Sequence, residues 1–153
     1  MPRGDTYQTL LAFDYGLKQI GVAQGQTLTG GANALSIVRA ADGVPNWREI
    51  ESLIQEWKPD LLLVGLPLNM DGSESDLSQR ARKFARRLEG RFQCEVLMVD
   101  ERLTSREVKI SLRQEASQTS GKAKAADLSK IDHLAAALIL QSWLDNPQLG
   151  RRV

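Results

Sequence analysis

The sequence has little of what would place it in a secreted or membrane class of protein. It contains one cysteine, Cys94, so no disulfide can form within the chain, which fits a reducing cytosol. No apolar run approaches the ~18 residues of a membrane span. Residues 1–8 also lack the apolar core of a signal peptide. We therefore expect a cytoplasmic protein with no membrane partner.

An excess of charge of one sign is also missing. The chain has 20 basic and 19 acidic residues, giving a net charge of +1 at pH 7. This balance excludes a strongly basic nucleic-acid binder on global charge, although a local basic patch is compatible with it. Repeats and linkers are absent as well. With 153 residues, 42% hydrophobic and 25% charged, we expect one globular domain over residues 1–153.

The chain is organised around residues 10–23, LLAFDYGLKQIGVA. An apolar run from Leu10 to Phe13 ends on Asp14, a glycine turn follows, and a second apolar run begins at Ile20. Short apolar runs bounded by turn residues predict buried strands, here paired as an antiparallel hairpin. Because a buried, unpaired carboxylate is costly, Asp14 should sit at a strand end beside a metal ion, a phosphate-bound metal or a cationic side chain.

Strands and helices are predicted to alternate after this hairpin. We expect a third strand over 34–39, a loop over 42–46, a helix from Trp47 to Pro59, a strand over 61–66 and a loop over 67–75. A second helix, with inward apolar residues from Leu77 to Leu88 and an arginine-rich outer face, should be capped by Gly90, and a strand over 94–99 follows it.

The last third of the sequence predicts mostly helix. A capping-box pattern starts a helix at Thr104 that runs to about Arg113, and residues 115–128 are expected to form a mobile loop. A final helix should begin at Ser129, with Ile131, Leu134, Ala135, Leu138 and Ile139 facing inward. The whole order predicts an α/β fold, a mixed sheet made of a three-strand antiparallel meander and two further strands, flanked by helices.

Acidic residues occur at three separated element ends: Asp14, the pair Asp100-Glu101, and Asp132. If they converge, each pair of carboxylates ~4 Å apart costs about 4 kcal/mol at an effective dielectric of ~20, and divalent metal would remove that repulsion. Hard oxygen ligands without a Cys/His set suit Mg²⁺ or Mn²⁺ rather than Zn²⁺. Two such ions could activate water for attack on a phosphodiester.

Simpler interpretations exist for each acid taken alone. Asp14 could be an ordinary turn residue before glycine. Asp132, three residues after Ser129, could cap the last helix. Glu101 could form a surface ion pair with Arg102 or Arg106.

Two further points stay open on the residues alone. Period-2 alternation does not choose between Asp100 and Glu101, because both faces of the preceding strand are apolar. The arginines of the second helix could form a solvated face or a patch that binds a nucleic-acid backbone. The single histidine, His133, leaves the inward stripe and is expected at the surface.

Four motifs in this order resemble the YqgF family of Holliday-junction-resolvase-like proteins and pre-16S rRNA nucleases. They are DYGLKQIGVA, VGLPLNMDGSES, VDERLTSREV and KIDHLAAALIL. The resemblance covers nearly the whole chain. It implies an RNase H-like fold and endonucleolytic cleavage with Mg²⁺ or Mn²⁺, serving maturation of the 5′ end of pre-16S rRNA on the small ribosomal subunit.

The resemblance also implies roles for individual residues. By position, the catalytic and metal-binding acids would be Asp14, Glu101 and Asp132, with Asp100 the less favoured choice for the second. Substrate contacts would come from Lys18, Asn69, Arg102 and Thr104.

Several alternatives remain beside this function. The substrate could be structured RNA or branched DNA, the protein a monomer or a dimer, and the fold could serve a non-catalytic nucleic-acid-binding factor. Actin-like ATPases and sugar kinases also begin with Asp-x-Gly, but 153 residues leave no room for their second lobe.

Overall fold

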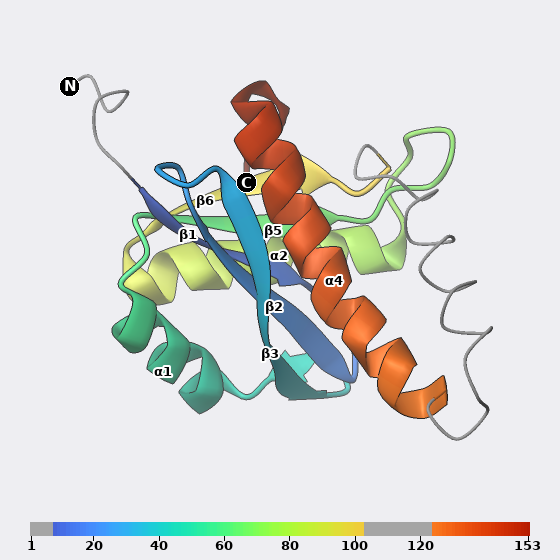
Figure 1. Cartoon of the computed structure of the whole chain (residues 1–153). Coiled ribbons are helices and arrows are strands. Elements are labelled where there is room, and N and C mark those ends of the chain that lie inside the picture. The colour runs from blue at the N-terminus through green and yellow to red at the C-terminus, as the bar shows by residue number, and fades with distance from the viewer. Residues whose placement is uncertain (1–7, 103–123) are drawn as a thin grey trace.

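A computed structural model describes residues 8–102 and 124–153, and for 124–133 only the backbone. The elements alternate much as the sequence predicts (Figure 1). They are β1 (Thr9–Asp14), β2 (Gln19–Gln26), β3 (Gly31–Ala41), β4 (Val44–Pro45), α1 (Trp47–Trp57), β5 (Leu61–Leu66), α2 (Asp76–Phe92), β6 (Glu95–Asp100), α4 (Lys124–Asp145), a 3-10 turn (Pro147–Leu149) and β7 (Arg151–Arg152). None of the helices in these ranges is long and apolar enough to cross a membrane.

The seven strands form one mixed sheet in the order β4-β3-β2-β1-β5-β6-β7. β1, β2 and β3 pair antiparallel, which confirms the predicted meander. β5 pairs parallel with β1, and β6 pairs parallel with β5. The carboxyl ends of β1, β5 and β6 therefore lie at the same edge of the sheet.

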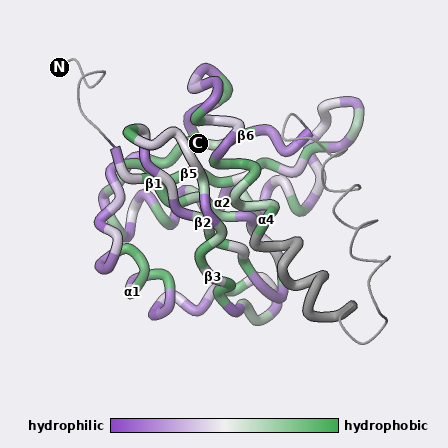
Figure 2. The backbone as a smooth tube through the Cα atoms, in the orientation of Figure 1, coloured by the Kyte–Doolittle hydropathy of each residue, from purple (hydrophilic) through white to green (hydrophobic). Residues whose placement is uncertain are grey.

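Helices cover both faces of the sheet. In Figure 1, α4 crosses one face, and α1 and α2 lie on the other. The buried side chains accordingly form two clusters, and alternate residues of β1 enter each: Leu11 and Phe13 pack towards α1 and α2, whereas Leu10 and Ala12 pack towards α4. Hydrophilic segments of the chain lie largely at the periphery (Figure 2).

Burial on both faces explains why β5, LLLVGL, is apolar throughout. All six of its residues are buried, as expected for a central parallel strand. The helices that flank it begin at side-chain caps: Asn46 accepts hydrogen bonds from the first backbone N–H groups of α1, and Ser75 forms a capping box with Ser78 at the start of α2.

Two predicted helix ends are wrong. α2 continues through Gly90 to Phe92, and the left-handed cap is Gln93, with φ 50°. Glycine favours such a cap but is not required for it. α4 begins at Lys124 rather than Ser129, so residues 124–128 are helical and not loop. The alanines and the leucine of that segment are strong helix formers.

The strands also differ in extent from the prediction. The third strand spans 31–41 rather than 34–39, and residues 44–45, predicted as loop, pair with it as β4. β7 was not predicted; it pairs with β6. β7 depends on a distant partner and leaves no local pattern. β4 instead follows β3 across the two-residue turn Asp42-Gly43, in which both residues have positive φ, so its pairing is a local hairpin. The predicted helix from Thr104 and the loop residues 115–123 lie outside the described residues.

The inward faces of two helices were predicted only in part. Leu77, expected to be inward, is 36% exposed in the first turn of α2. Among the α4 side chains that are described, from residue 134 on, the buried ones are Ala135, Ala136, Ile139, Leu140 and Trp143. Because α4 is apolar on most sides around residues 134–140, periodicity alone does not fix which side faces the sheet.

Candidate active site

Asp14 is the last residue of β1, and its side chain is half-buried. It lies opposite Gly21 of β2. The parallel register of β1 and β5 makes Gly65 its neighbour on the other side. Since Leu10 and Ala12 pack against α4, alternation along the strand assigns Asp14 to that same face of the sheet.

Glu101 follows β6 at the same edge of the sheet. Its backbone N–H donates a hydrogen bond of 3.0 Å to the carbonyl oxygen of Leu66, which fixes the chain as it leaves the strand. Its side chain lies over Gly65: a Cβ atom placed on that glycine would be 2.6 Å from Glu101 Oε1 and 2.6 Å from Ile139 Cδ1. The carboxylate of Glu101 is therefore on the face covered by α4.

The spacing of the strands brings the two acids towards each other. Neighbouring strands lie about 4.8 Å apart, so β1 and β6 are separated by roughly 10 Å, with β5 between them. The Glu101 side chain extends back over β5, so its carboxylate lies closer to β1, the strand that ends at Asp14, than the spacing of the strands alone would place it. Gly65 makes this possible because it places no side chain between the two carboxylates.

Asp100 faces the other way. It is only 6% exposed, and it alternates with Val96 and Met98, which belong to the cluster under α1 and α2. Its carboxylate is held by Arg102 through Nη2 at 2.7 Å and Nε at 3.1 Å, and by the Arg102 backbone N–H at 2.9 Å. Burial would raise the pKa of Asp100, but the hydrogen bonds and charge of Arg102 outweigh it and hold that pKa below its ordinary value.

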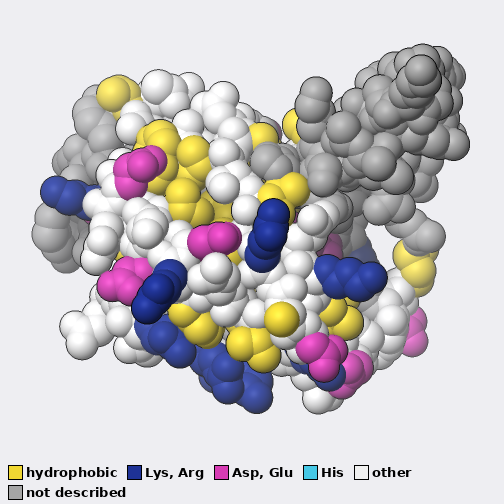
Figure 3. All heavy atoms as spheres, turned by 90° about the horizontal axis from the view of Figure 1, so that it is seen from below, with side chains coloured by type: hydrophobic (Ala, Val, Ile, Leu, Met, Phe, Trp, Pro, Cys, Tyr) yellow, Lys and Arg dark blue, Asp and Glu magenta, His cyan; other side chains and the backbone are white. Residues whose placement is uncertain are grey.

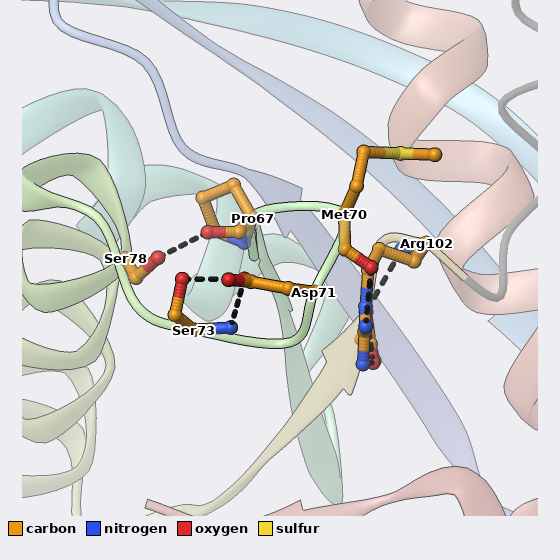
Figure 4. A network of polar contacts seen from close by, with 7 residues as sticks. Pro67, Met70, Asp71, Ser73, Ser78 and Arg102 are labelled. Atoms are coloured by element: carbon orange, nitrogen blue, oxygen red, sulfur yellow. Dashed lines mark hydrogen bonds and ion pairs between the residues drawn. The ribbon is translucent and has the colours of Figure 1, made fainter.

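Arg102 also ties the end of β6 to the loop between β5 and α2 (Figure 4). Its Nη1 donates to the carbonyl oxygen of Met70 at 3.3 Å. Within the loop, Asp71 Oδ1 accepts from the backbone N–H and hydroxyl of Ser73, and these bonds lower the pKa of Asp71. Asn69 Nδ2 donates to Ser73 Oγ at 2.9 Å. Asn69 therefore lies in a hydrogen-bonded loop to which Arg102, the other predicted substrate contact, is joined through Met70.

Lys18 shares a hollow with Asp14, which we call the Asp14 hollow. It measures about 480 Å³ and is lined by Asp14, Tyr15, Gly16, Leu17, Lys18, Gln19, Gly21 and Leu77. The Lys18 side chain is exposed, and its backbone carbonyl accepts a hydrogen bond from Ala40, which anchors the turn. Leu77 was predicted to be core; its exposure at a helix start is a feature that the apolar pattern does not reveal.

The remaining predicted residues cannot be placed as fully. Residue 132 lies in α4, four residues before the buried Ala136. The side chains of Asp132 and His133 are outside the described part of the structure. Thr104 also lies outside the described residues. Among the side chains that are described, no three carboxylate, imidazole or thiol groups gather closely enough to hold a metal ion. The structure places two of the three predicted acids, Asp14 and Glu101, at the same edge and on the same face of the sheet.

Comparison of the sequence with known proteins gives a consistent result. Residues 8–146 match the RuvX family, described as a Holliday junction resolvase. The chain is 54% identical over 138 residues to a protein of Haemophilus ducreyi named "Putative pre-16S rRNA nuclease", covering 90% of this chain and 96% of the relative. A Shewanella denitrificans protein of the same name is 52% identical over 139 residues, covering 91% and 95%.

Two solved structures with a similar fold are resolvases. RuvC of Thermus thermophilus in complex with a Holliday junction substrate superposes with a TM-score of 0.52 at 11% identity, over 95% of this chain and 99% of RuvC. The fowlpox virus resolvase bound to Holliday junction DNA gives 0.51 at 14% identity, over 89% and 98%. These likenesses show the RNase H-like fold. The family match and the sequence relatives establish that the chain is a nuclease and belongs to the RuvX (YqgF) family.

Proposed function

We propose that this nuclease is a metal-dependent endonuclease that processes the 5′ end of pre-16S rRNA in the cytoplasm. The observation that carries the proposal is the placement of Asp14 and Glu101 on one face of the sheet, at the carboxyl ends of β1 and β6, with only Gly65 between them. Asp132, from α4 on that same face, would complete the set.

The residues at this edge fit a divalent metal. Both carboxylates offer hard oxygen ligands, and Gly65 has no side chain that would displace the Glu101 carboxylate, whose Oε1 lies 2.6 Å from where a Cβ atom would be. These donors suit Mg²⁺ or Mn²⁺. When bound, such ions would supply a more acidic water and neutralise charge on the phosphate that is cut.

The other residues would position the substrate. Lys18 is exposed on the rim of the Asp14 hollow, where its ammonium can pair with a backbone phosphate. Arg102 neutralises the buried Asp100 and holds the carbonyl of Met70, so its first role would be to order the loop that carries Asn69. Asn69 would then present its side chain beside the site at low entropic cost. Thr104, which lies outside the described residues, would be a further substrate contact.

The substrate is inferred from the relatives. Identity above 50% over nine-tenths of the chain to proteins named as pre-16S rRNA nucleases favours structured RNA, with the small ribosomal subunit as partner. A Holliday junction resolvase is the second candidate, because the family description and the fold neighbours are resolvases. A resolvase that cuts two strands symmetrically should be a two-fold dimer, so native mass would help to separate the candidates.

A parallel cleavage assay tests the proposal. A 5′-extended 16S precursor, free and on the small subunit, should be incubated beside a four-way DNA junction with Mg²⁺, Mn²⁺ or EDTA. We expect cleavage of the precursor that EDTA abolishes and that Asp14→Asn loses. Cleavage of the junction alone would favour the resolvase. No cleavage of either substrate would favour a non-catalytic binding factor, and cleavage that survives Asp14→Asn would contradict the site.

A further inference from the structure

A second hollow lies on the other side of Tyr15 from the Asp14 hollow. It measures about 390 Å³, and we call it the basic hollow; it is lined by Tyr15, Asp42, Gly43, Val44, Pro45, Trp47, Arg80, Lys83, Phe84 and Arg87. Tyr15 follows Asp14 in the chain and lines both hollows. Residues 16–18 follow Tyr15 directly and lie next to it in the lining of the Asp14 hollow.

Cations outnumber anions in the basic hollow. Arg80, Lys83 and Arg87 are spaced three and four residues apart, so they project from the same side of α2. Arg80 pairs with the highly exposed Asp76 at 3.1 Å, whereas Lys83 and Arg87 form no ion pair with any carboxylate whose position is described. The one acid in the lining is Asp42. Lys and Arg side chains gather in the lower part of the face shown in Figure 3, beside hydrophobic ones.

The hollow is built on a rigid aromatic base. The Tyr15 hydroxyl donates a 2.6 Å hydrogen bond to the carbonyl of Gly43, which ties the end of β1 to the turn before β4. Phe84 contacts both Tyr15 and Trp47, with ring centroids 5.1 Å and 5.8 Å apart. Burial raises the pKa of Tyr15, against the opposing effect of Arg80 and Arg87, so the phenol stays neutral.

The aromatic rings are not available for stacking on bases. Trp47 is stacked with Phe84 and also lies under the guanidinium of Arg91, whose Cζ is 4.1 Å from the ring centroid. Tyr15 and Phe84 are 8% and 3% exposed. A nucleic acid in this hollow could therefore meet cations but not an open ring, which favours contact with phosphates and no preference for sequence.

We propose that the basic hollow binds a backbone phosphate of the nucleic-acid substrate, away from the phosphate cut at Asp14. The substrate strand would run from the Asp14 hollow across the turn at residues 16–18 and place a second phosphate between Lys83 and Arg87. This proposal rests on the proposed function for the identity of the substrate, but the binding itself requires only a nucleic acid. It gives the charged face of α2 a role in orienting the strand.

Charge argues against a second copy of the chain as the occupant. α2 carries six basic residues and two acidic ones, although the whole chain is nearly neutral. Two such helices facing each other would repel, whereas a phosphodiester backbone supplies the opposite charge. The basic residues of α2 therefore form a local basic patch, which the nearly neutral net charge of the whole chain does not reveal.

The test compares two double variants of the same helix. Lys83→Gln/Arg87→Gln removes two cations from the basic hollow. Arg82→Gln/Arg86→Gln removes two neighbouring cations that do not line it. Both are made in an Asp14→Asn background, and binding to a fluorescent 5′-extended 16S precursor fragment and to a four-way DNA junction is titrated between 50 and 200 mM salt. Thermal unfolding checks that both variants fold.

We expect Lys83→Gln/Arg87→Gln to weaken binding about tenfold and to reduce the salt slope by about 1 to 2, as for the loss of two phosphate contacts. Arg82→Gln/Arg86→Gln should change the affinity and the salt slope much less. Equal losses in the two variants would overturn the proposal, because they would reflect general charge. The proposal would also be overturned if analytical sedimentation gave a different molecular mass for Lys83→Gln/Arg87→Gln alone, because α2 would then form an interface between two copies of the chain.

This result is separable from the proposed function. If the wild-type protein cuts neither nucleic acid but Lys83→Gln/Arg87→Gln alone loses affinity and salt dependence, the binding site stands and the nuclease proposal fails. If the precursor is cut normally and both double variants bind like the Asp14→Asn parent, the nuclease proposal stands and the basic hollow is not a phosphate site.

Discussion

At the scale of single residues, the most informative position is Gly65, because its missing side chain decides where Glu101 can lie. The carboxylate of Glu101 and the end of Ile139 both occupy the space over this glycine. A residue with any side chain would separate Glu101 from Asp14. The motif VGLPLNMDGSES contains this glycine, but the sequence does not reveal that its partner is an acid 36 positions further along the chain.

Gly65→Ala should impair both stability and cleavage. The new Cβ would lie 2.6 Å from Ile139 Cδ1 and 2.6 Å from Glu101 Oε1, so the core must shift and the carboxylate must move. We expect the free energy of unfolding to fall by about 1–3 kcal/mol and cleavage to fall beyond what the unfolded fraction explains. Gly31→Ala is the control, since a Cβ there would meet nothing within 4 Å. Urea titration and a cleavage assay on the same samples measure the two effects. If Gly65→Ala and Gly31→Ala lose stability and cleavage to the same extent, the role assigned to Gly65 is contradicted.

The Asp100–Arg102 pair makes a second prediction, on pH. The pKa of folded Asp100 is lower than in the unfolded chain, so its contribution to stability is present above about pH 4 and is lost as pH falls through the folded value. Because Arg102 is 37% exposed, we expect Asp100→Asn to cost only about 1–2 kcal/mol at pH 7. The difference from wild type should shrink towards pH 3 in urea titrations. Asp76→Asn is the control: its carboxylate is 86% exposed, so this variant should change the free energy of unfolding little at either pH. If the stability difference between Asp100→Asn and wild type grows as the pH falls, the ion pair of Asp100 with Arg102 does not stabilise the fold as predicted.

At the scale of elements, α2 differs from its predicted end in a way that can be measured. Gly90 lies inside the helix, and a Cβ there would meet nothing within 4 Å. Gly90→Ala should therefore raise the free energy of unfolding by about 0.5–1 kcal/mol. By contrast, Gly43→Ala should destabilise the protein, because Gly43 has φ +86° and its Cβ would lie 2.8 Å from Tyr15 Oη. Thermal unfolding compares the two; destabilisation by Gly90→Ala would mean that the helix ends before residue 90.

The elements that the sequence predicts best are those with a strong local pattern. The apolar run of β5 and the 3.6-residue spacing in α1 and α2 each identify an element without reference to the rest of the chain. The errors occur where tertiary contacts decide. β7 exists only because β6 offers it an edge, and the inward face of α4 depends on which apolar side packs on the sheet. β4 is a different case, because the Asp42-Gly43 turn that joins it to β3 is a local hairpin signal in the sequence.

At the scale of the whole molecule, the site depends on which face of the sheet each acid occupies. The sequence predicts that acids lie at strand ends, and the order of elements predicts that these ends share an edge. It leaves Asp100 and Glu101 equivalent, because both faces of β6 are buried. Packing separates them: Asp100 lies under α1 and α2 with Arg102, and Glu101 lies under α4 over Gly65. The same two-faced sheet places the basic hollow on the side of Asp100, opposite to Asp14 and Glu101.

The most direct test of this account compares the two neighbouring acids, in single-turnover cleavage of the 5′-extended 16S precursor. We predict that Glu101→Gln, like Asp14→Asn, slows cleavage about a hundredfold or more. Asp100→Asn should cut at close to the wild-type rate once its folded fraction is taken into account. Asp60→Asn, at the opposite end of β1, where Asp60 accepts a 2.9 Å hydrogen bond from the Thr9 N–H, serves as the matched control. Normal cleavage by Glu101→Gln together with loss in Asp100→Asn would contradict the account.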